Sequence, residues 1–400
     1  IDWLFDRDNG IGLTIYRFEV GAGGINESPD PWRRAETFEI ASGEYDWSRC
    51  ANAVNVLRLA VEAGVDTVMF FANSPPGRMT LSGKTTGADS GGPNLKPDME
   101  GEFARYLVDI ALHFKAEGIP VRYISPINEP QWDWQASKGQ EGCHYEPDQI
   151  IKMVEALTEE LNRRCPEIRP SLVDSGKWLD QTYTINIYKD LASNPVVGPA
   201  MDHFAVHSYW SNSVGKQMVV NQLKDTGSGL PLWQTEWCQM ENGRDFGMES
   251  ALKLAQTVHE DMTVGNCSAW INWIAVSCYD YKDGLVYVDL DDRRVLDTKR
   301  LWALGNYSRF IREGYKRIVI SGKPGGILAS AYLSPDSQTA VLVAINSGKS
   351  AEALDIRAEG FVFYMAYETS VSHSLSCVAS GVPGRYSFPA ESVTTLVYKK

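Results

Sequence analysis

The chain has no uninterrupted run of about eighteen apolar residues, the length that a membrane-spanning helix needs. It also has no initiator Met and no recognisable signal peptide, and it opens abruptly with Ile1–Phe5. Such a beginning is typical of a mature or trimmed product. We therefore expect no transmembrane helix, and we expect a secreted or extracellular protein whose signal peptide has been removed.

Basic residues are in the minority. The 38 Lys and Arg residues are outnumbered by 51 Asp and Glu residues, which gives a formal net charge of −13. A protein of this sign repels phosphate backbones and anionic lipid headgroups, so we expect neither nucleic acid nor a membrane as a partner. An uncharged substrate is more compatible with this balance.

Cysteine is scarce, and its spacing excludes a zinc framework because no Cys-x-x-Cys pair occurs. Buried thiols and one or two disulfides are both open for the seven cysteines, which are Cys50, Cys143, Cys165, Cys238, Cys267, Cys278 and Cys377. His203 and His207 are four residues apart on an expected strand and have no third ligand nearby in the sequence. We expect no metal and no cofactor.

Hydrophobic periodicity divides the chain into two regions. Short apolar strands alternate with amphipathic helices from about residue 12 to 312, which is typical of a parallel sheet or barrel. The expected strands cover 13–20, 66–72, 121–128, 170–174, 202–208, 231–236 and 267–274. The expected helices cover 98–117, a segment that begins near 147, and 298–312.

After Gly314 the pattern changes to short strands joined by turns, over 329–333, 340–346, 361–367 and 393–398. We expect an α/β protein with a catalytic (β/α)8 TIM barrel over 1–314 and a small antiparallel β-sandwich domain over 315–400. A closed barrel of this kind has eight strands. We therefore expect that the first strand is absent from this chain, or that an irregular element fills the gap.

Two glutamates occupy comparable places, because Glu129 and Glu236 each end an apolar strand, 236 − 129 = 107 residues apart. Active sites of barrels lie at the carboxyl ends of the strands. In glycoside hydrolysis one carboxylic acid protonates the leaving oxygen and a second carboxylate acts as nucleophile or base. Either glutamate alone could be a solvated strand end, but the combination of Asn-Glu-Pro with Thr-Glu-Trp favours a catalytic pair.

The segments around these glutamates resemble a known family. Residues 124–132 resemble the acid/base segment of glycoside hydrolase clan A, and in detail that of family 30, while 233–237 resemble its nucleophile strand. Residues 301–314 resemble the last barrel helix and its exit into the family's β-sandwich. The resemblance implies a retaining double displacement, with Glu129 as general acid and then base, and Glu236 as the nucleophile. Glu129 is then expected to be protonated at the outset and Glu236 ionised.

Four polar residues are expected to support this chemistry. Asn128 can hydrogen-bond the sugar 2-hydroxyl. Arg17 is a cation inside an apolar strand, which either forms a structural salt bridge or keeps the nucleophile ionised. The family carries an arginine in a matching strand, which favours the second role. His207 and Tyr209 are two residues apart and face one side of a strand, and the resemblance implies that Tyr209 donates to Glu236.

Further residues are expected to bind the substrate. Trp273 ends the last expected barrel strand, where it either floors the subsite of the cleaved sugar or packs in the core. Trp132 and Trp134 follow the acid on a loop and are expected to bind sugars beyond the scissile bond. Asn73 ends another strand and is expected to hydrogen-bond sugar hydroxyls.

Family members act on β-1,4-xylan, β-1,6-glucan, β-1,6-galactan or glucosylceramide, so the resemblance alone leaves the glycan open. The segments 128–134, 140–143 and 279–284 most resemble the endo-β-1,6-galactanase branch. We expect a monomer that acts on arabinogalactan side chains. The alternatives are a xylanase that uses Lys282 to bind a uronic acid, a β-1,6-glucanase, a glycolipid hydrolase, and a non-catalytic carbohydrate-binding protein, which would lack one of the two carboxylates.

Overall fold

The computed structural model describes residues 1–322, 324–381 and 384–400. The chain forms two compact units. The parallel-sheet unit comprises Thr14–Trp237 with Val264–Ile271, and the β-rich unit comprises Ile1–Leu13, Cys238–Thr263 and Asn272–Lys400. The domain boundary predicted at residue 314 stays a prediction.

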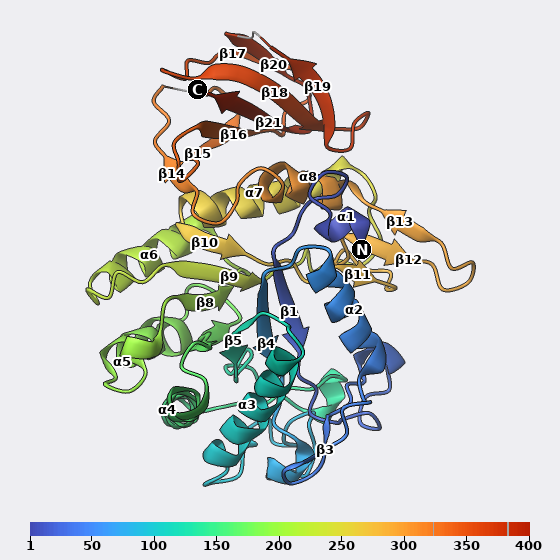
Figure 1. Cartoon of the computed structure of the whole chain (residues 1–400), viewed down its shortest axis with the longest axis vertical. Helices are drawn as coiled ribbons and strands as arrows, with labels where there is room; N and C mark the ends of the chain where they lie inside the picture. The colour runs from blue at the N-terminus through green and yellow to red at the C-terminus, as the bar shows by residue number, and fades with distance from the viewer. Residues whose placement is uncertain (323, 382–383) are drawn as a thin grey trace. The chain divides into compact units, whose positions relative to one another are not determined.

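The parallel-sheet unit contains two four-stranded sheets, with the strand orders β1-β4-β5-β6 and β10-β9-β8-β7. All neighbouring strands in both sheets are parallel, and Figure 1 shows β8, β9 and β10 running side by side. Their bounds are β1 Ile15–Glu19, β4 Thr67–Phe71, β5 Val121–Ser125, β6 Arg169–Pro170, β7 Val173–Ser175, β8 Phe204–His207, β9 Leu232–Glu236 and β10 Cys267–Trp270. Each predicted strand region is confirmed, although the fourth is divided into β6 and β7.

Helices separate most of these strands, as the βα pattern predicts. They are α2 Ala51–Glu62, α3 Glu100–Ala116, α4 Pro147–Arg164, α5 Ile187–Ser193 and α6 Ser213–Lys224. In α3 the apolar stripe of Phe103, Leu107, Ile110 and Phe114 is buried, because these residues recur every three or four positions. The start of α4 has Pro147 in the first turn and a capping box between Glu146 and Gln149. The short hairpin β2 Glu39–Ala41 and β3 Glu44–Tyr45 lies between β1 and α2 in sequence.

The β-rich unit contains a six-stranded antiparallel sheet with the order β14-β15-β16-β21-β18-β19, a two-stranded sheet of β17 and β20, and a three-stranded sheet of β11, β12 and β13. The bounds are β11 Val276–Ser277, β12 Val286–Val288, β13 Val295–Asp297, β14 Lys316–Ile318, β15 Leu328–Leu333, β16 Thr339–Asn346, β17 Glu352–Asp355, β18 Val362–Thr369, β19 Ser376–Ser380, β20 Arg385–Phe388 and β21 Ser392–Lys399. The four strands predicted after Gly314 are confirmed as β15, β16, β18 and β21.

The core of the antiparallel sheet is apolar, and it includes Ile327, Ala344, Phe363, Ala366, Phe388 and Leu396. The helices of this unit are α1 Asp2–Phe5, α7 Met248–Thr263 and α8 Lys299–Ser308. Asn306 on α8 is buried and donates to Thr395 on β21, while Thr369 on β18 donates to it. These bonds fix α8 to the sheet.

Among the described residues, no helix is both long and apolar enough to cross a bilayer.

Candidate active site

A buried arginine gathers side chains from several strands of the parallel-sheet unit. Arg17 lies in the middle of β1, and its side chain is only 4% exposed. Its Nη1 donates to Oε2 of Glu236 at 2.7 Å, and its Nη2 donates to Oδ1 of Asn128 at 2.8 Å and to Oδ2 of Asp174 at 3.1 Å. The guanidinium also lies 3.6 Å from the ring centroid of Phe71. Burial lowers the pKa of Arg17, but the charges of Asp174 and Glu236 outweigh burial and raise it.

Asp174, which the sequence analysis missed, is the fully buried carboxylate beneath this site. It ends the predicted strand 170–174, and Ser125 and Thr235 donate hydroxyl hydrogen bonds to it at 2.6 Å and 2.5 Å. Burial raises the pKa of Asp174, but the charges of Arg17 and His207 and the two hydroxyls outweigh burial and hold it below its usual value. The available signal was an acid inside an apolar strand, the same signal that identified Arg17.

Glu236 is the last residue of β9 and is buried. Arg17 donates to its Oε2, and the Tyr209 hydroxyl donates to its Oε1 at 3.0 Å. His207 on the neighbouring strand β8 is paired with Glu236 in the sheet register. The structure therefore places Arg17, Tyr209 and Glu236 together, as the resemblance implied, and both oxygens of this carboxylate have a hydrogen-bond donor.

Glu129 lies just beyond the end of β5, in a left-handed conformation with φ of 47°. Its N–H donates to the carbonyl of Asp174 at 2.9 Å. The side-chain oxygens contact Nδ1 of His207 at 2.9 Å and Nε1–H of Trp132 at 3.1 Å. Gly176 allows this arrangement, because a Cβ atom at that position would lie 2.9 Å from Oε1 of Glu129. The acid predicted from Asn-Glu-Pro is thus held by its backbone and by both carboxylate oxygens.

His207 lies between the two glutamates. Its Nδ1 is 2.9 Å from Oε1 of Glu129 and 3.9 Å from Oε1 of Glu236. A carboxylate oxygen of Glu129 lies within 4.8 Å of a carboxylate oxygen of Glu236. Burial lowers the pKa of His207, but the charges of Glu236, Glu129 and Asp174 outweigh burial and raise it. The imidazole therefore balances part of the negative charge that the two glutamates bring together.

The same three side chains have the spacing of a metal site, because Glu129, His207 and Glu236 each offer one ligand atom. Nδ1 of His207 and carboxylate oxygens of both glutamates already take part in hydrogen bonds among themselves and with Tyr209 and Arg17. The guanidinium of Arg17 also places a positive charge 2.7 Å from Glu236, which opposes a second cation. The arrangement therefore suits proton transfer and nucleophilic attack by carboxylates better than metal binding.

Two tryptophans lie beside the acid. Trp132 and Trp210 meet edge to face, with ring centroids 5.5 Å apart, and Trp210 is 67% exposed. Lys177 lies over the Trp132 ring at 5.7 Å. Trp210 was not predicted from the sequence, although its position directly after Tyr209 near a strand end is the same kind of signal that identified Trp132. An aromatic pair with one exposed ring, next to the predicted acid, suits the apolar faces of sugar rings.

Two other predicted tryptophans lie elsewhere. Trp134 is only 7% exposed, its Nε1–H donates to the carbonyl of Glu129 at 2.9 Å, and Gly142 packs against its ring. This tryptophan positions the acid, and its predicted contact with sugar stays a prediction without an exposed ring face to support it. Trp273 belongs to the β-rich unit, and its predicted role beneath the cleaved sugar also stays a prediction.

The predicted sugar ligand Asn73 donates a hydrogen bond to Oε1 of Glu19 at 2.7 Å.

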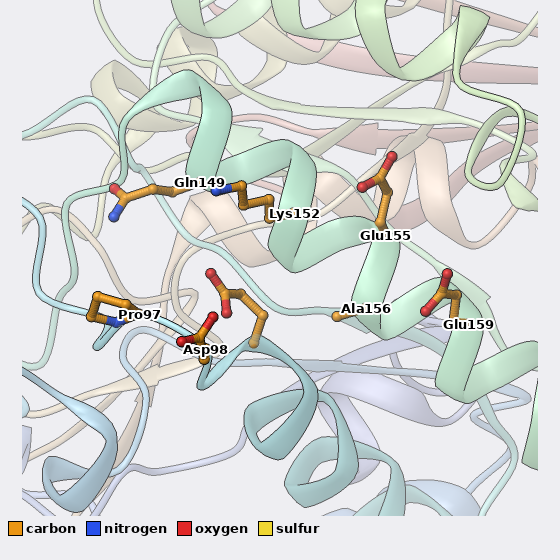
Figure 2. Close-up of a pocket in the computed structure, with 8 residues that line it drawn as sticks. Pro97, Asp98, Gln149, Lys152, Glu155, Ala156 and Glu159 are labelled. Carbon is orange, nitrogen blue, oxygen red and sulfur yellow. The ribbon is translucent and has the colours of Figure 1, made fainter.

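A separate hollow of about 430 Å³ lies between the segment before α3 and the helix α4 (Figure 2). It is lined by Pro97, Asp98, Glu100, Gln149, Lys152, Glu155, Ala156 and Glu159. None of these residues is aromatic, and four of them carry carboxylates, so the hollow lacks the stacking surface that a neutral sugar uses. None of the predicted site residues lines it.

The chain is similar to known glycoside hydrolases. A model of O-glycosyl hydrolase family 30 matches residues 5–287. An endo-β-1,6-galactanase of Hypocrea rufa is 26% identical over 85% of this chain and 71% of its own length, and a glucuronoxylanase of Bacillus subtilis is 24% identical over 82% and 72%. The crystal structure of a conserved exported protein from Bacteroides fragilis superposes with a TM-score of 0.89 at 27% identity, covering 99% of this chain and 91% of that one.

A pair of strand-end carboxylates on parallel sheets, with this match, defines a glycosidase. The chain belongs to O-glycosyl hydrolase family 30.

The buried carboxylate of Asp174 should stabilise the fold in a pH-dependent way. Asp174→Asn is expected to lower the free energy of unfolding at neutral pH by about 3 kcal/mol, because buried Arg17 loses a charged partner. The folded pKa of Asp174 is depressed, so its contribution is present above the unfolded pKa of about 3.9 and is lost as the pH falls through the folded value.

Urea unfolding of both proteins between neutral pH and about pH 3 tests this expectation. The wild type should lose stability below about pH 4 more steeply than Asp174→Asn. Asp225→Asn, which changes an exposed aspartate, is the matched control. Parallel pH profiles for the wild type and Asp174→Asn would contradict the predicted role.

Proposed function

We propose that this glycosidase is a retaining endo-β-1,6-galactanase that acts on arabinogalactan side chains. The spacing of the two glutamates carries the proposed mechanism. One oxygen of Glu129 and one of Glu236 lie within 4.8 Å of each other. Retaining enzymes hold their carboxyl groups roughly 5–5.5 Å apart, whereas inverting enzymes need about 6.5–9.5 Å to admit a water between them. The short spacing supports a covalent intermediate.

In the first step the carboxylate of Glu236 forms a bond to the anomeric carbon of the substrate. The bond from that carbon to the leaving oxygen breaks, and Glu129 gives its proton to this oxygen. In the second step Glu129 takes a proton from water, whose oxygen attacks the anomeric carbon and displaces Glu236. Each displacement inverts the carbon, so the product keeps the configuration of the substrate.

The contacts of the two glutamates suit different roles. Glu236 accepts hydrogen bonds from Arg17 and Tyr209. Two donors, one of them a cation, complement the negative charge of an ionised nucleophile. Glu129 instead pairs with His207 at 2.9 Å, where the shared proton can lie on the carboxylic acid or on the imidazole. This pair can therefore store the proton that the first step uses and receive the proton that the second step produces.

We also propose that the two parallel sheets belong to one barrel of the (β/α)8 type. Arg17 on β1 contacts Asp174 on β7 and Glu236 on β9, so side chains from both sheets meet in one interior. Such a meeting is expected when strands surround a common axis. The family's architecture supports the same arrangement.

The ion pair of Lys282 favours galactan over glucuronoxylan as the substrate. The xylanase alternative uses this cation for a uronic acid, but Lys282 is held by Glu241 at 2.7 Å. The Hypocrea rufa relative, an endo-β-1,6-galactanase, also matches this chain at 26% identity. We further propose an extracellular monomer, and the exported Bacteroides fragilis protein with the same fold supports the location.

The proposed roles of the glutamates predict different outcomes for their variants. Glu236→Gln should abolish turnover, because the amide cannot form the glycosyl-enzyme. Glu129→Ala should slow hydrolysis by about 10²–10⁴-fold. Azide should partly restore the rate on an aryl glycoside and give a glycosyl azide of retained configuration, because azide needs no general base. NMR of the products measures both the rate of product formation and the configuration of the glycosyl azide.

Glu159→Ala, which changes an exposed glutamate of α4, is the matched control and should behave as wild type. Activity of Glu236→Gln near the wild-type level would remove the nucleophile assignment. A Glu129→Ala rate that azide leaves unchanged would remove the acid/base assignment.

The aromatic pair of Trp132 and Trp210 should bind sugars on the leaving-group side of the acid. Trp210→Ala is expected to lower kcat/KM on long galacto-oligosaccharides by about tenfold, because apolar contact with a sugar ring is lost. Its effect on aryl monosaccharides should be small. Trp32→Ala changes a tryptophan that is also exposed, at 61%, and serves as control. An equal loss on long and short substrates would place Trp210 outside the outer subsites.

The substrate is tested by incubating the purified chain with β-1,6-galactan, β-1,4-xylan and β-1,6-glucan in parallel and separating the products by size. Short β-1,6-galacto-oligosaccharides are expected. Products from xylan or glucan alone would keep the mechanism and overturn the proposed substrate.

A further inference from the structure

Glu19, a carboxylate that has no role in the mechanism above, lies beside the proposed nucleophile. It is the last residue of β1 and follows Arg17 by two positions, so the two side chains leave the same face of the strand. Successive residues of a strand advance by about 3.3 Å, which places Glu19 roughly 6.6 Å nearer the carboxyl end, where barrel sites open. Arg17 contacts Glu236 directly, and the charge of Glu236 also helps to raise the pKa of Glu19, so the two carboxylates are near neighbours.

Asn73 joins Glu19 from the neighbouring strand. β4 runs parallel to β1 with Phe71 opposite Glu19, and Asn73 follows Phe71 by two residues. Nδ2 of Asn73 donates to Oε1 of Glu19 at 2.7 Å. Among the described residues, none donates a hydrogen bond to Oε2 of Glu19 or to Oδ1 of Asn73. The pair therefore holds two open acceptor oxygens near the reacting centre.

The surroundings of Glu19 give it little structural reason to be a carboxylate. Glu19 forms no ion pair with a Lys, Arg or His among the described residues. Burial raises the pKa of Glu19, which means that its ionised form is costly in the folded chain. The hydrogen bond from Asn73 and the charge of Arg17 offset only part of this cost, and ionisable groups with such a perturbed pKa are concentrated at functional sites.

A second carboxylate fixes the backbone that follows Glu19. The N–H groups of Ala22 and Gly24 both donate to Glu141 at 2.9 Å. Burial, with the nearby charge of Glu19, raises the pKa of Glu141 to about 8. Gly24 is required there, because a Cβ atom would lie 3.1 Å from Oε1 of Glu141 and would clash with Thr85. The segment after β1 is thus held rigidly, and Glu19 is preorganised with it.

We propose that Glu19 and Asn73 form a specificity-determining pair that accepts hydrogen bonds from two hydroxyl groups of the sugar attacked by Glu236. The inference rests on the proposed function and identifies the chemistry of that subsite as a neutral, hydroxyl-bearing sugar. A hydroxyl group donates to a carboxylate in a charge-assisted bond. A uronic acid offers a second carboxylate instead, which Glu19 repels. The pair therefore selects against uronic acids at this subsite.

Glu19→Gln is compared with wild type on an aryl glycoside of the preferred neutral sugar and on its monodeoxy analogues. Wild type should lose about tenfold or more in kcat/KM when either contacted hydroxyl is removed. Glu19→Gln should lose less than about threefold when the hydroxyl that Glu19 contacts is removed, because a neutral amide accepts more weakly, and it should keep the wild-type loss at the hydroxyl that Asn73 contacts. Asn73→Ala should reduce the discrimination at one position, and it provides a second variant if Glu19→Gln folds poorly.

The corresponding aryl uronide supplies a second readout. Glu19→Gln should raise kcat/KM on the uronide relative to the neutral glycoside by at least about tenfold, because like-charge repulsion is removed. Glu44→Gln, an exposed glutamate of β3, should match wild type in both assays. A general loss of activity with unchanged discrimination would show a structural role for Glu19 and overturn the inference.

The outcomes also separate this inference from the proposed substrate. If the wild type prefers a neutral sugar other than galactose, the same comparison is made with that sugar, and only the galactan proposal fails. A wild type that prefers the uronide over every neutral glycoside would overturn the pair's assignment while leaving the retaining mechanism in place. A chain that turns over none of these substrates would overturn both proposals.

Discussion

The buried guanidinium of Arg17 is the interaction on which the site depends. A cation with a side chain only 4% exposed is tolerated because Asp174 and Glu236 supply opposite charge and Asn128 supplies a further acceptor. These partners come from separate strands or strand ends, so one side chain sets the relative positions of several elements. The contact with Glu236 that helps to balance the charge of Arg17 therefore also orients the proposed nucleophile.

The backbone at the site departs from regular geometry where the carboxylates approach each other. Glu129 and Asp174 both have left-handed φ values, 47° and 52°, which cost free energy in residues with a Cβ atom. The bond from the Glu129 N–H to the Asp174 carbonyl joins these two positions, and Gly176 leaves space for the Glu129 carboxylate. The surrounding strands impose this geometry, which brings the acid within reach of His207 and Trp132.

Much of the fold follows from local patterns in the chain. The strands of the parallel sheets were predictable because they are short, nearly continuous apolar runs, and the helices α3 and α4 because their apolar residues recur with a period of about 3.6 that matches the buried face. Glu129, Glu236 and Arg17 stand out for a related reason, since a charged residue within or at the end of an apolar strand is costly unless it has a partner. Asp174 has the same signature, but its strand is short and irregular, so its position beneath the site was not evident.

The sequence by itself determined which elements form and which charged groups must be satisfied inside them. Only the tertiary structure decided which groups satisfy one another, because the contacts join residues far apart in the chain: Arg17 and Glu236 are 219 positions apart, and His207 and Glu129 are 78 apart. The tertiary structure also decided which tryptophans are exposed. Trp210 is exposed beside the acid, whereas Trp134 is buried and donates a hydrogen bond to the backbone of Glu129. Periodicity describes one element at a time, whereas the distance between two carboxylates and the exposure of a ring depend on how the strands are placed together.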